Sequence, residues 1–435
     1  MRISRTVATV GATVAGLTAT AVVLAGTAGA ATAAPTTILL SRNQAGVDGN
    51  LHSMFPGISR DGRFVTFRSN ATNLIPRKPN EPPARDVYLW DRTSGQLEAV
   101  SVDTAGHRLP GHSGGGPSPV TSSGRFVAFD SLVARPTPAD PGHQNFDVFL
   151  RTRFGHGAGR TDDITPGLGG APANGSSSVG GISEDGRFVA LTSAASNLVA
   201  GDTNGKSDVF VRDNGYHMTI RVSVSSTGVA GNDDSGNAQL SANGRYVVYV
   251  SRATNLVPGD TNGVADIFLF DRLTRKTERI SVDSAGKQLP GDSDYPSISD
   301  DGRYVAFGSF GSTSSTPQVY VRDRVAGTTT VVSVNNHGVP GDGLSGHPSI
   351  SGSGRYVSFQ SFARNLVPGV SGNEIYVRDL VKHKTSLGSA GNDGSAANGP
   401  TFFAQVSDAG VAFQSLARNL GGHANGNYQV YLRTF

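Results

Sequence analysis

Short apolar runs recur along the chain and are separated by stretches rich in Gly, Asn and Asp. Two examples are RYVAF at 303–307 and DIFLFD at 266–271. These runs are continuous rather than strictly alternating, which is typical of strands that their neighbours bury on both faces. No long segment has apolar residues at helical spacing, and glycine is abundant, with 57 residues. The pattern therefore predicts an all-β protein rich in turns.

The strand pattern occurs seven times, each time on an anchor of the form Ser-x-x-Gly-Arg-aromatic-Val. The anchor reads SRDGRFVTF from Ser59 and SDDGRYVAF from Ser299, and a shortened copy, SDAGVAF, begins at Ser407. Repeats that hold four short strands are typical of β-propeller blades. The anchor glycines are Gly62, Gly124, Gly186, Gly244, Gly302, Gly354 and Gly410.

Each repeat is predicted to hold four strands, A to D. Examples are PSIS at 296–299 for A, RYVAF at 303–307 for B, DIFLFD at 266–271 for C and ERISVD at 278–283 for D. The last repeat stops at a strand C, YQVYLRTF, whereas TTILLSRNQAGVDGN from Thr36 matches a strand D and its following loop. We therefore expect the N-terminal strand to complete the last blade. The result is a seven-bladed β-propeller of four-stranded antiparallel blades with no open sheet edge.

The repeated motif is similar to that of a known group of proteins. Ser-x-Asp-Gly-Arg-x-Val-x-Phe followed by a strand such as DVFVRD, at 208–213, resembles the TolB-like, WD-repeat-like propeller family over nearly the whole chain after residue 34. The resemblance implies the propeller fold. Its members range from binding scaffolds to the propeller domains of peptidases. The repeats are not accompanied by a helical, amidohydrolase or peptidase domain, which argues against the enzyme branches of the family.

The N-terminus predicts export. Arg2 and Arg5 are the only charges in the first 34 residues, and an Ala-, Val- and Thr-rich stretch with A-x-A sites follows them. This pattern favours a cleaved signal peptide at 1–34 over a membrane anchor, because the stretch is only modestly apolar. We expect a secreted protein, free or associated with the cell envelope, whose propeller covers 35–435. No later segment has the length and hydrophobicity of a transmembrane helix.

Charge and cysteine content exclude several classes of function. Without Arg2 and Arg5, the 37 Lys and Arg become 35, against 34 Asp and Glu, so the net charge is close to zero. There is no run of Lys or Arg, which argues against a nucleic acid partner. Cysteine is absent, so disulfides, thiolate metal sites and cysteine nucleophiles are excluded.

The loops differ in length in a way that predicts a ligand face. The A–B and C–D turns are short, whereas the B–C and D–A loops are long, as in SRATNLVPGDTNGVA at 251–265. In an up-and-down blade the two long loops lie on the same side, around the mouth of the central channel. Rigid scaffolds present binding groups on such loops. We therefore expect the ligand on this face.

A repeated B–C loop motif, GDTNG, is compatible with calcium. It places Asp, Asn and Asp at relative positions 1, 3 and 7 around a glycine, and hard oxygen ligands at alternating positions can wrap a calcium ion. The alternative is an ordinary turn, because Asn-Gly and Asp-x-Asn favour turns on their own. Calcium is the one cofactor that the sequence suggests, and a structural role for it is favoured over a catalytic one. The candidate ligands are Asp202, Asn204, Asp208, Asp260, Asn262 and Asp266.

The remaining sequence motifs give little support for a catalytic or metal-binding site. GHSGG at 111–115 matches the pattern of a hydrolase nucleophile, but it aligns with GDSDY at 291–295 in a D–A loop, and no helix follows. No histidine pair has metal-ligand spacing, and no catalytic residue is predicted. Arg63 and its equivalents are expected to pair with strand acids or carbonyls. The NLVPG phrases are expected to begin turns in which the leucine packs inward.

The sequence favours a secreted, monomeric binding module over an enzyme. The expected partner is an extracellular protein or a polysaccharide. The alternative is a secreted propeller enzyme, a polysaccharide lyase or hydrolase, that acts at the channel mouth; a third hypothesis is a structural protein rigidified by calcium. Clustered carboxylates or histidines around the channel would favour the enzyme, whereas a mouth lined by Ser, Gly and Asn would favour binding.

Overall fold

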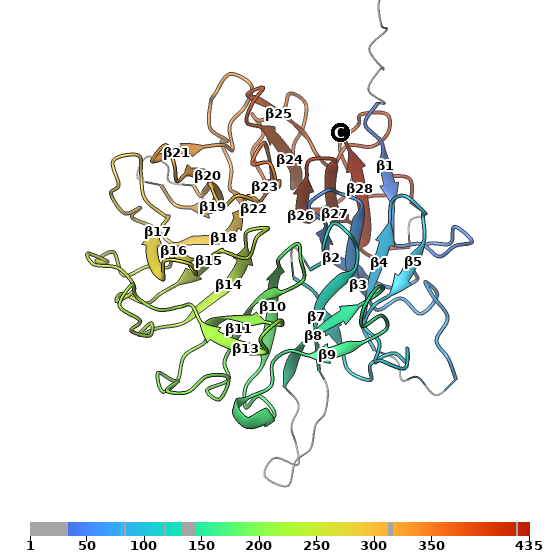
Figure 1. Ribbon diagram of the computed structural model, residues 1–435. Helices are drawn as coiled ribbons and strands as arrows, with labels where there is room; N and C mark the ends of the chain where they lie inside the picture. The colour runs from blue at the N-terminus through green and yellow to red at the C-terminus, as the bar shows by residue number, and fades with distance from the viewer. Residues whose placement is uncertain are drawn as a thin grey trace, which may run out of the picture. The chain divides into compact units, whose positions relative to one another are not determined.

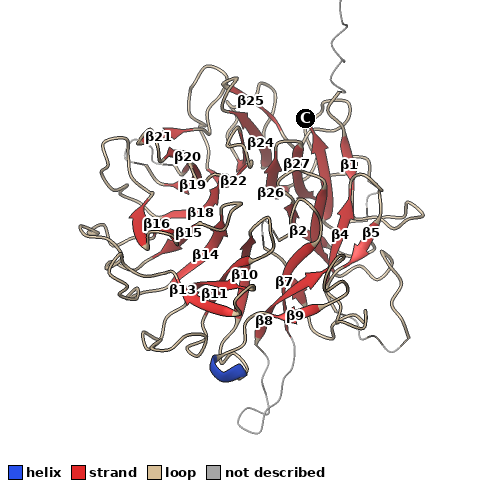
Figure 2. Ribbon diagram, in the orientation of Figure 1, coloured by secondary structure: helices blue, strands red, loops and turns tan. Residues whose placement is uncertain are grey.

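The computed structural model describes residues 34–79, 81, 84–116, 119–132, 145–311, 316–422 and 425–435. The predicted signal peptide lies outside this part of the chain, apart from Ala34. Residues 35–435 form one compact unit, in which seven antiparallel sheets of four strands are arranged as blades of a ring (Figure 1). Strands dominate, and the one helix drawn is a short 3-10 turn, η1 (Leu168–Gly170) (Figure 2). The predicted all-β, seven-bladed propeller is confirmed.

The first four blades follow one another along the chain, and each runs from the innermost to the outermost strand. Blade 1 holds β2 (Ser53–Ile58), β3 (Phe64–Ser69), β4 (Asp86–Asp91) and β5 (Leu97–Ala99). Blade 2 holds β6 (Ser113–Gly114), β7 (Phe126–Leu132), β8 (Phe146–Thr152) and β9 (Thr161–Asp163). Blade 3 holds β10 (Ser177–Ile182), β11 (Phe188–Ser193), β12 (Asp208–Asp213) and β13 (Met218–Arg221). Blade 4 holds β14 (Ser235–Leu240), β15 (Tyr246–Ser251), β16 (Asp266–Asp271) and β17 (Lys276–Arg279).

The last three blades complete the ring, and blade 7 takes its outermost strand from the N-terminus. Blade 5 holds β18 (Ser293–Ile298), β19 (Tyr304–Ser309), β20 (Gln318–Asp323) and β21 (Thr328–Val331). Blade 6 holds β22 (Ser345–Ile350), β23 (Tyr356–Ser361), β24 (Glu374–Asp379) and β25 (Lys384–Leu387). Blade 7 holds β26 (Thr401–Ser407), β27 (Gly410–Ser415), β28 (Gln429–Thr434) and β1 (Thr37–Leu39).

The N-terminal strand closes the ring as predicted. β1 pairs with β28 in antiparallel register, with Thr37 opposite Arg433 and Leu39 opposite Tyr431. The backbone N of Thr37 also donates to Oδ1 of Asn392 at 2.6 Å, which ties β1 to the loop after blade 6. This pairing covers the edge of β28 that would otherwise be open to another strand.

The outermost strands begin earlier and end earlier than the sequence predicted. In blade 4 the prediction was 278–283, whereas β17 covers Lys276–Arg279. Beyond Arg279 the chain leaves the sheet and forms its own small hairpin, in which Val282 bridges Gln288 and the N of Lys287 donates to Oδ1 of Asp283. The apolar residues at 280 and 282 misled the prediction, because Ile280 packs in the core between blades 4 and 5 rather than in the sheet.

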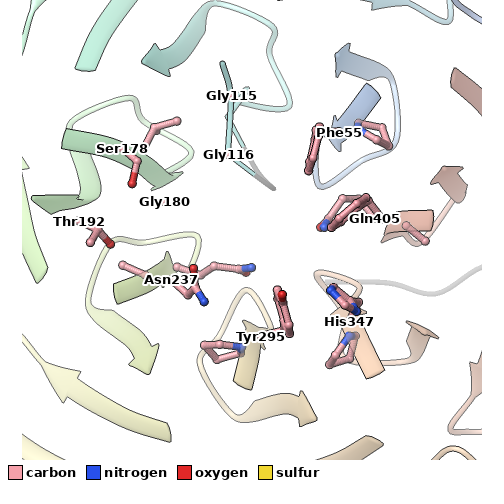
Figure 3. A pocket seen from close by; sticks show the side chains of 18 residues that line it. Phe55, Gly115, Gly116, Ser178, Gly180, Thr192, Asn237, Tyr295, His347 and Gln405 are labelled. Atoms are coloured by element: carbon pink, nitrogen blue, oxygen red, sulfur yellow. The ribbon is translucent and has the colours of Figure 1, made fainter. Parts of the chain in front are cut away.

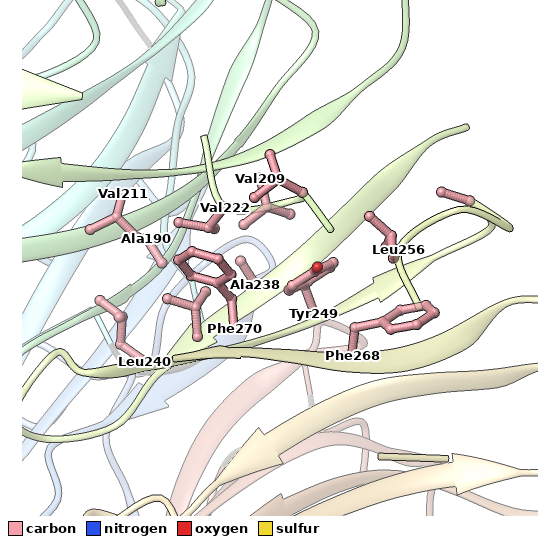
Figure 4. Packing of buried hydrophobic residues seen from close by; sticks show 13 residues of the cluster. Ala190, Val209, Val211, Val222, Ala238, Leu240, Tyr249, Leu256, Phe268 and Phe270 are labelled. Atoms are coloured by element: carbon pink, nitrogen blue, oxygen red, sulfur yellow. The ribbon is translucent and has the colours of Figure 1, made fainter. Parts of the chain in front are cut away.

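The hydrophobic cores lie between neighbouring blades. Val211 of blade 3 packs in one cluster with Leu240, Tyr249 and Phe270 of blade 4 (Figure 4). Every residue of β16 is buried, which explains why strand C is a continuous apolar run rather than an alternating one. Burial on both sheet faces fixes each blade against its neighbours.

A bidentate Arg–Asp pair closes the same turn in five blades. In blade 4, Nη2 of Arg245 lies 2.7 Å from Oδ2 of Asp271 and its Nε donates to Oδ1. The pair joins the start of strand B to the end of strand C, so the pairing predicted for Arg63 and its equivalents is confirmed. The other pairs are Arg63–Asp91, Arg187–Asp213, Arg303–Asp323 and Arg355–Asp379.

Hydrogen bonds place the two kinds of loop on opposite sides of the ring. The N of Arg272 donates to the O of Arg245, which joins a C–D turn to an A–B turn. Nδ2 of Asn255 donates to the O of Ala230, which joins a B–C loop to a D–A loop. The leucine after this asparagine, Leu256, is buried as predicted. Among the described residues, no helix has the length and apolar character that crossing a membrane requires.

Candidate functional site in the central channel

The innermost strand of each blade lines the central channel, and six of these strands contain a bulge. The register shifts between Asp294 and Ser297 in β18, for example. Bulges re-aim side chains and are frequent near functional sites. At five of them a residue other than glycine has a positive φ, a conformation that costs on the order of 1–3 kcal/mol. These residues are Phe55 (54°), Asn237 (52°), Tyr295 (48°), His347 (49°) and Phe403 (49°).

The five strained residues occupy equivalent positions in their strands and line the same cavity. Each is the third residue of its strand, so all five lie at one level of the channel. A cavity of about 260 Å³ lies at that level and is lined by residues of all seven blades. The bulges thus hold a ring of side chains around this cavity.

One side of the cavity is aromatic. We call Phe55, Tyr295, His347 and Phe403 the aromatic arc; they come from blades 1, 5, 6 and 7 (Figure 3). The ring centroids are 4.5 Å apart for Phe55 and Phe403, and 3.9 Å apart for Tyr295 and His347. His347 meets Phe403 edge to face at 5.3 Å. The four rings therefore form a continuous wall. Burial lowers the pKa of His347, so its imidazole is neutral near pH 7.

The opposite side is built from small and polar residues. Gly115, Gly116, Ser178, Gly180, Thr192 and Asn237 line it (Figure 3). Two carboxamides, Gln239 and Gln405, also face the cavity. Within the described chain, the side chains of Ser178, Thr192, Asn237, Gln239 and Gln405 form no hydrogen bond with another protein group. The cavity is thus ringed by donors and acceptors without a protein partner.

Charged groups stand beside the cavity rather than in its lining. The guanidinium of Arg68 lies 3.4 Å from the centroid of Phe55, and burial lowers the pKa of Arg68 to about 10. Asp294 precedes Tyr295 in β18. The Asp294 side chain is in part accessible to solvent; desolvation by the surrounding protein, together with the charge of Asp292, raises its pKa to about 6.

Arg60 spans the channel at the end that carries the A–B turns. Its Nη1 donates to Oδ1 of Asp300 at 2.5 Å and its Nη2 to the O of Leu240 at 2.8 Å. Its Nε lies 3.3 Å from Oε1 of Glu184. We call these contacts the Arg60 bridge; it joins blade 1 to blades 3, 4 and 5. A pocket of only about 20 Å³ lies at this level, lined in part by Arg60 and Leu240. Because the Arg60 side chain crosses the channel here, we infer that it closes the 260 Å³ cavity on the turn side.

The first GDTNG loop is organised around an arginine. Nη1 of Arg221 lies 2.9 Å from Oδ1 of Asp202 and 3.1 Å from Oδ2 of Asp208. Nδ2 of Asn204 donates to the same oxygen of Asp208, and Oγ of Ser223 donates to the other. Burial raises the pKa of Asp202 despite the arginine. Arg221 thus occupies the space between the two carboxylates.

The second copy repeats this arrangement. Arg279 lies 3.3 Å from Asp260 and 3.7 Å from Asp266, and Nδ2 of Asn262 donates to Asp266 at 3.1 Å. Burial raises the pKa of both carboxyl groups. Across the described parts of the chain, no three His, Cys, Asp or Glu side chains gather closely enough to hold a metal ion. Calcium binding at these loops stays a prediction.

The structure also places the GHSGG segment. Ser113 is fully buried in β6 and its Oγ donates to Oγ of Ser131 at 2.9 Å. Nδ1 of His112 accepts from the N of Arg85. Ser113 therefore belongs to a structural serine pair, one of which occurs at this position in most blades, and not to a catalytic triad.

Sequence reasoning missed the aromatic arc. The signal was a short phrase in three innermost strands, an aromatic residue or histidine directly before proline: FP at 55–56, YP at 295–296 and HP at 347–348. Aligning the seven innermost strands would have placed these residues at one level.

Comparisons with known proteins bear on the fold alone. No family model and no curated protein matches the chain. An oligogalacturonate lyase from Vibrio parahaemolyticus matches at 11% identity over 92% of this chain and 97% of that one, with a TM-score of 0.52. The β-propeller domain of the trilobed protease from Pyrococcus furiosus matches at 11% identity over 88% and 93%, with a TM-score of 0.51. TolB from Acinetobacter baumannii also matches, at 14% identity over 80% and 76% and a TM-score of 0.39. The lyase and the protease domain, whose TM-scores exceed 0.5, confirm the propeller architecture that the repeats predict.

Proposed function

We propose that this protein is a secreted binding module whose ligand enters the central channel from the side of the long loops. The observation that carries the proposal is the cavity lining, in which strained bulges hold an aromatic arc opposite polar side chains that have no protein partner. Exposed aromatic rings and convergent polar groups in a concave site are typical of ligand pockets. The ligand is an extracellular protein or a polysaccharide, and the module acts as a monomer.

The lining favours binding over catalysis. General acid–base chemistry needs positioned groups with suitable pKa values. Among the described residues that line the cavity, there is no Asp, Glu, Lys or Arg, and His347 is the single histidine. Ser, Gly and Asn dominate one wall, as expected for a binding site.

The alternative function, a secreted polysaccharide lyase or hydrolase, depends on one residue. Asp294 stands next to Tyr295, and its pKa of about 6 suits a general acid or base near neutral pH. A lyase or hydrolase acting at the channel mouth would need this carboxyl group. Turnover of a polysaccharide that Asp294→Asn abolishes, with binding retained, would establish the enzyme in place of the binding module.

The binding proposal is tested by filling the cavity. Ser178→Trp places a large side chain into the channel, and Leu273→Trp adds the same side chain to an exposed C–D turn on the opposite face. Thermal unfolding is measured with a panel of neutral oligosaccharides, uronic acid oligomers and peptides. A panel member should stabilise the wild type and the Leu273 variant but not the Ser178 variant. Equal stabilisation of all three proteins would place the binding site outside the channel.

A further inference from the structure

We infer that the cavity receives a neutral sugar ring, the terminal residue of a glycan, stacked on the aromatic arc. The inference rests on the proposed function, since it assigns a ligand class to the same channel site. It follows from three features: the arc, the unpartnered polar side chains and the blind end.

The aromatic arc suits the apolar face of a pyranose. A sugar ring presents a patch of C–H groups on one face, and aromatic side chains offer a flat apolar surface with a negative π face that attracts such groups. Tyr295 is 40% exposed although it is large and apolar. Three further rings continue its surface across blades 6, 7 and 1. Positive φ at each of these positions fixes where the ring projects.

The polar wall suits vicinal hydroxyl groups. In this wall Asn237 and Gln239 each offer an amide that both donates and accepts, and Ser178 and Thr192 offer hydroxyls. Gln405 adds a third amide on the side of the arc, between Phe55 and His347 (Figure 3). A purely apolar ligand would leave these groups unpaired, which costs binding energy. An ionised group placed in this lining would lose its hydration without gaining a counter-ion from it. A neutral polyol can hydrogen-bond to these polar groups and carries no charge that would lose its hydration.

The blind end selects the terminus of a chain. The Arg60 bridge closes the channel on the turn side, so a polymer cannot thread through it. The volume of about 260 Å³ is below the usual range for drug-sized ligand pockets, and it suits one ring rather than several. A glycan would therefore enter end-on from the long-loop side, with its next residue near Asp294.

The test uses neutral oligosaccharides that end in glucose, galactose, mannose or N-acetylglucosamine, at up to millimolar concentration. Saturation-transfer NMR identifies the protons in contact, and calorimetric titration gives the dissociation constant. Tyr295→Asn removes one ring but keeps a side chain that tolerates positive φ, as Asn237 does in blade 4. We expect oligosaccharides with one of these termini to bind, with the strongest saturation transfer at the terminal ring. The Tyr295 variant should bind the same oligosaccharide about tenfold more weakly, and Ser178→Trp should not bind it.

Two results would overturn the inference, and they differ in what they mean for the proposed function. If uronic acid oligomers or peptides bind in a manner that Ser178→Trp abolishes, while no neutral oligosaccharide binds, the sugar assignment fails and the channel site stands. If no class of ligand responds to Ser178→Trp, both fail. Binding that is strongest at internal sugar residues, or unchanged in Tyr295→Asn, also contradicts end-on stacking.

Discussion

Nη1 of Arg60, in blade 1, lies 2.5 Å from Oδ1 of Asp300, in blade 5, so a single side chain links two blades across the channel. Neighbouring blades contact each other through hydrophobic cores and through ion pairs such as Arg153–Glu98 and Arg324–Glu278. The Arg60 bridge therefore does two things: it braces the ring across its diameter, and it makes the cavity blind.

Replacing Arg60 by Met should lower the free energy of unfolding by about 1 kcal/mol, since its partners Glu184 and Asp300 are partly exposed and screened by solvent. Urea unfolding of this variant and of Arg63→Met provides the check. Arg63 pairs with Asp91 within one blade and is itself 44% exposed, so its loss should cost less. A larger loss for the Arg63 variant would contradict the bracing role.

Arg221 should be far more important, because it neutralises two buried carboxylates, Asp202 and Asp208. Arg221→Met leaves both without a cation and should destabilise the fold by about 3–5 kcal/mol. Adding Asp202→Asn and Asp208→Asn removes the unpaired charge and should restore much of the loss. If the triple variant is as unstable as the single one, packing of the arginine stem is the cause instead.

The calcium prediction is checked by thermal unfolding of residues 35–435 in EDTA and in millimolar calcium. Because Arg221 and Arg279 already lie between the carboxylates, a calcium ion would have to displace them. If the loops are ordinary turns, Tm does not change. A bound ion at 100 times its dissociation constant would add about 2.7 kcal/mol, or a few degrees. A rise in Tm that Asp202→Ala with Asp260→Ala abolishes would show that the loops bind the metal.

Glu374 should make stability depend on pH. It stands where blades 3 and 4 have Asp208 and Asp266, but no arginine pairs with it in the described chain, and burial raises its pKa to about 7 from 4.5. The folded protein thus holds a proton that the unfolded chain releases above pH ~4.5. Its contribution to stability is full below that pH and is lost as the pH rises through 7, by up to about 3 kcal/mol.

Glu374→Gln provides the comparison, because blades 5 and 7 carry Gln318 and Gln429 at the same position, hydrogen-bonded to serine in the same way. The variant should match the wild type near pH 4.5 and exceed its stability at pH 8. Denaturant unfolding across this range gives the difference. A constant difference between the two proteins from pH 4.5 to 8 would show that Glu374 is not protonated in the fold.

The N-terminal strand should be essential for a soluble ring. Leu40 is fully buried next to β1, in the core that joins blades 7 and 1. Leu40→Ala should cost about 2–5 kcal/mol, measured by chemical unfolding. Deleting 35–41 should cause aggregation, because it opens the edge of β28. A truncated protein that stays monomeric in light scattering would show that β1 is dispensable.

The fold was predictable because the signals are local and repeated. In anchors such as SDDGRYVAF the glycine marks a tight turn, and Gly302 has a φ of 76° there. The site was less predictable because it is assembled from distant parts. The carboxylates of GDTNG were visible in sequence, but Arg221 lies on the next strand, opposite Phe210, and only pairing reveals it. The aromatic arc forms only where four blades meet. Residues 55, 295 and 347 share the step before proline, but Phe403 precedes Ala404 and lacks even that local signal.

The central claim, that ligand binds in the channel against the aromatic arc, is tested most directly by fluorine NMR at Tyr295. The protein is labelled with 3-fluorotyrosine, and the signal of Tyr295 is the one that disappears in Tyr295→Phe. Any panel member that raises Tm should shift this signal, because Tyr295 lines the cavity. A ligand that stabilises the protein and leaves the Tyr295 signal unchanged would contradict the account.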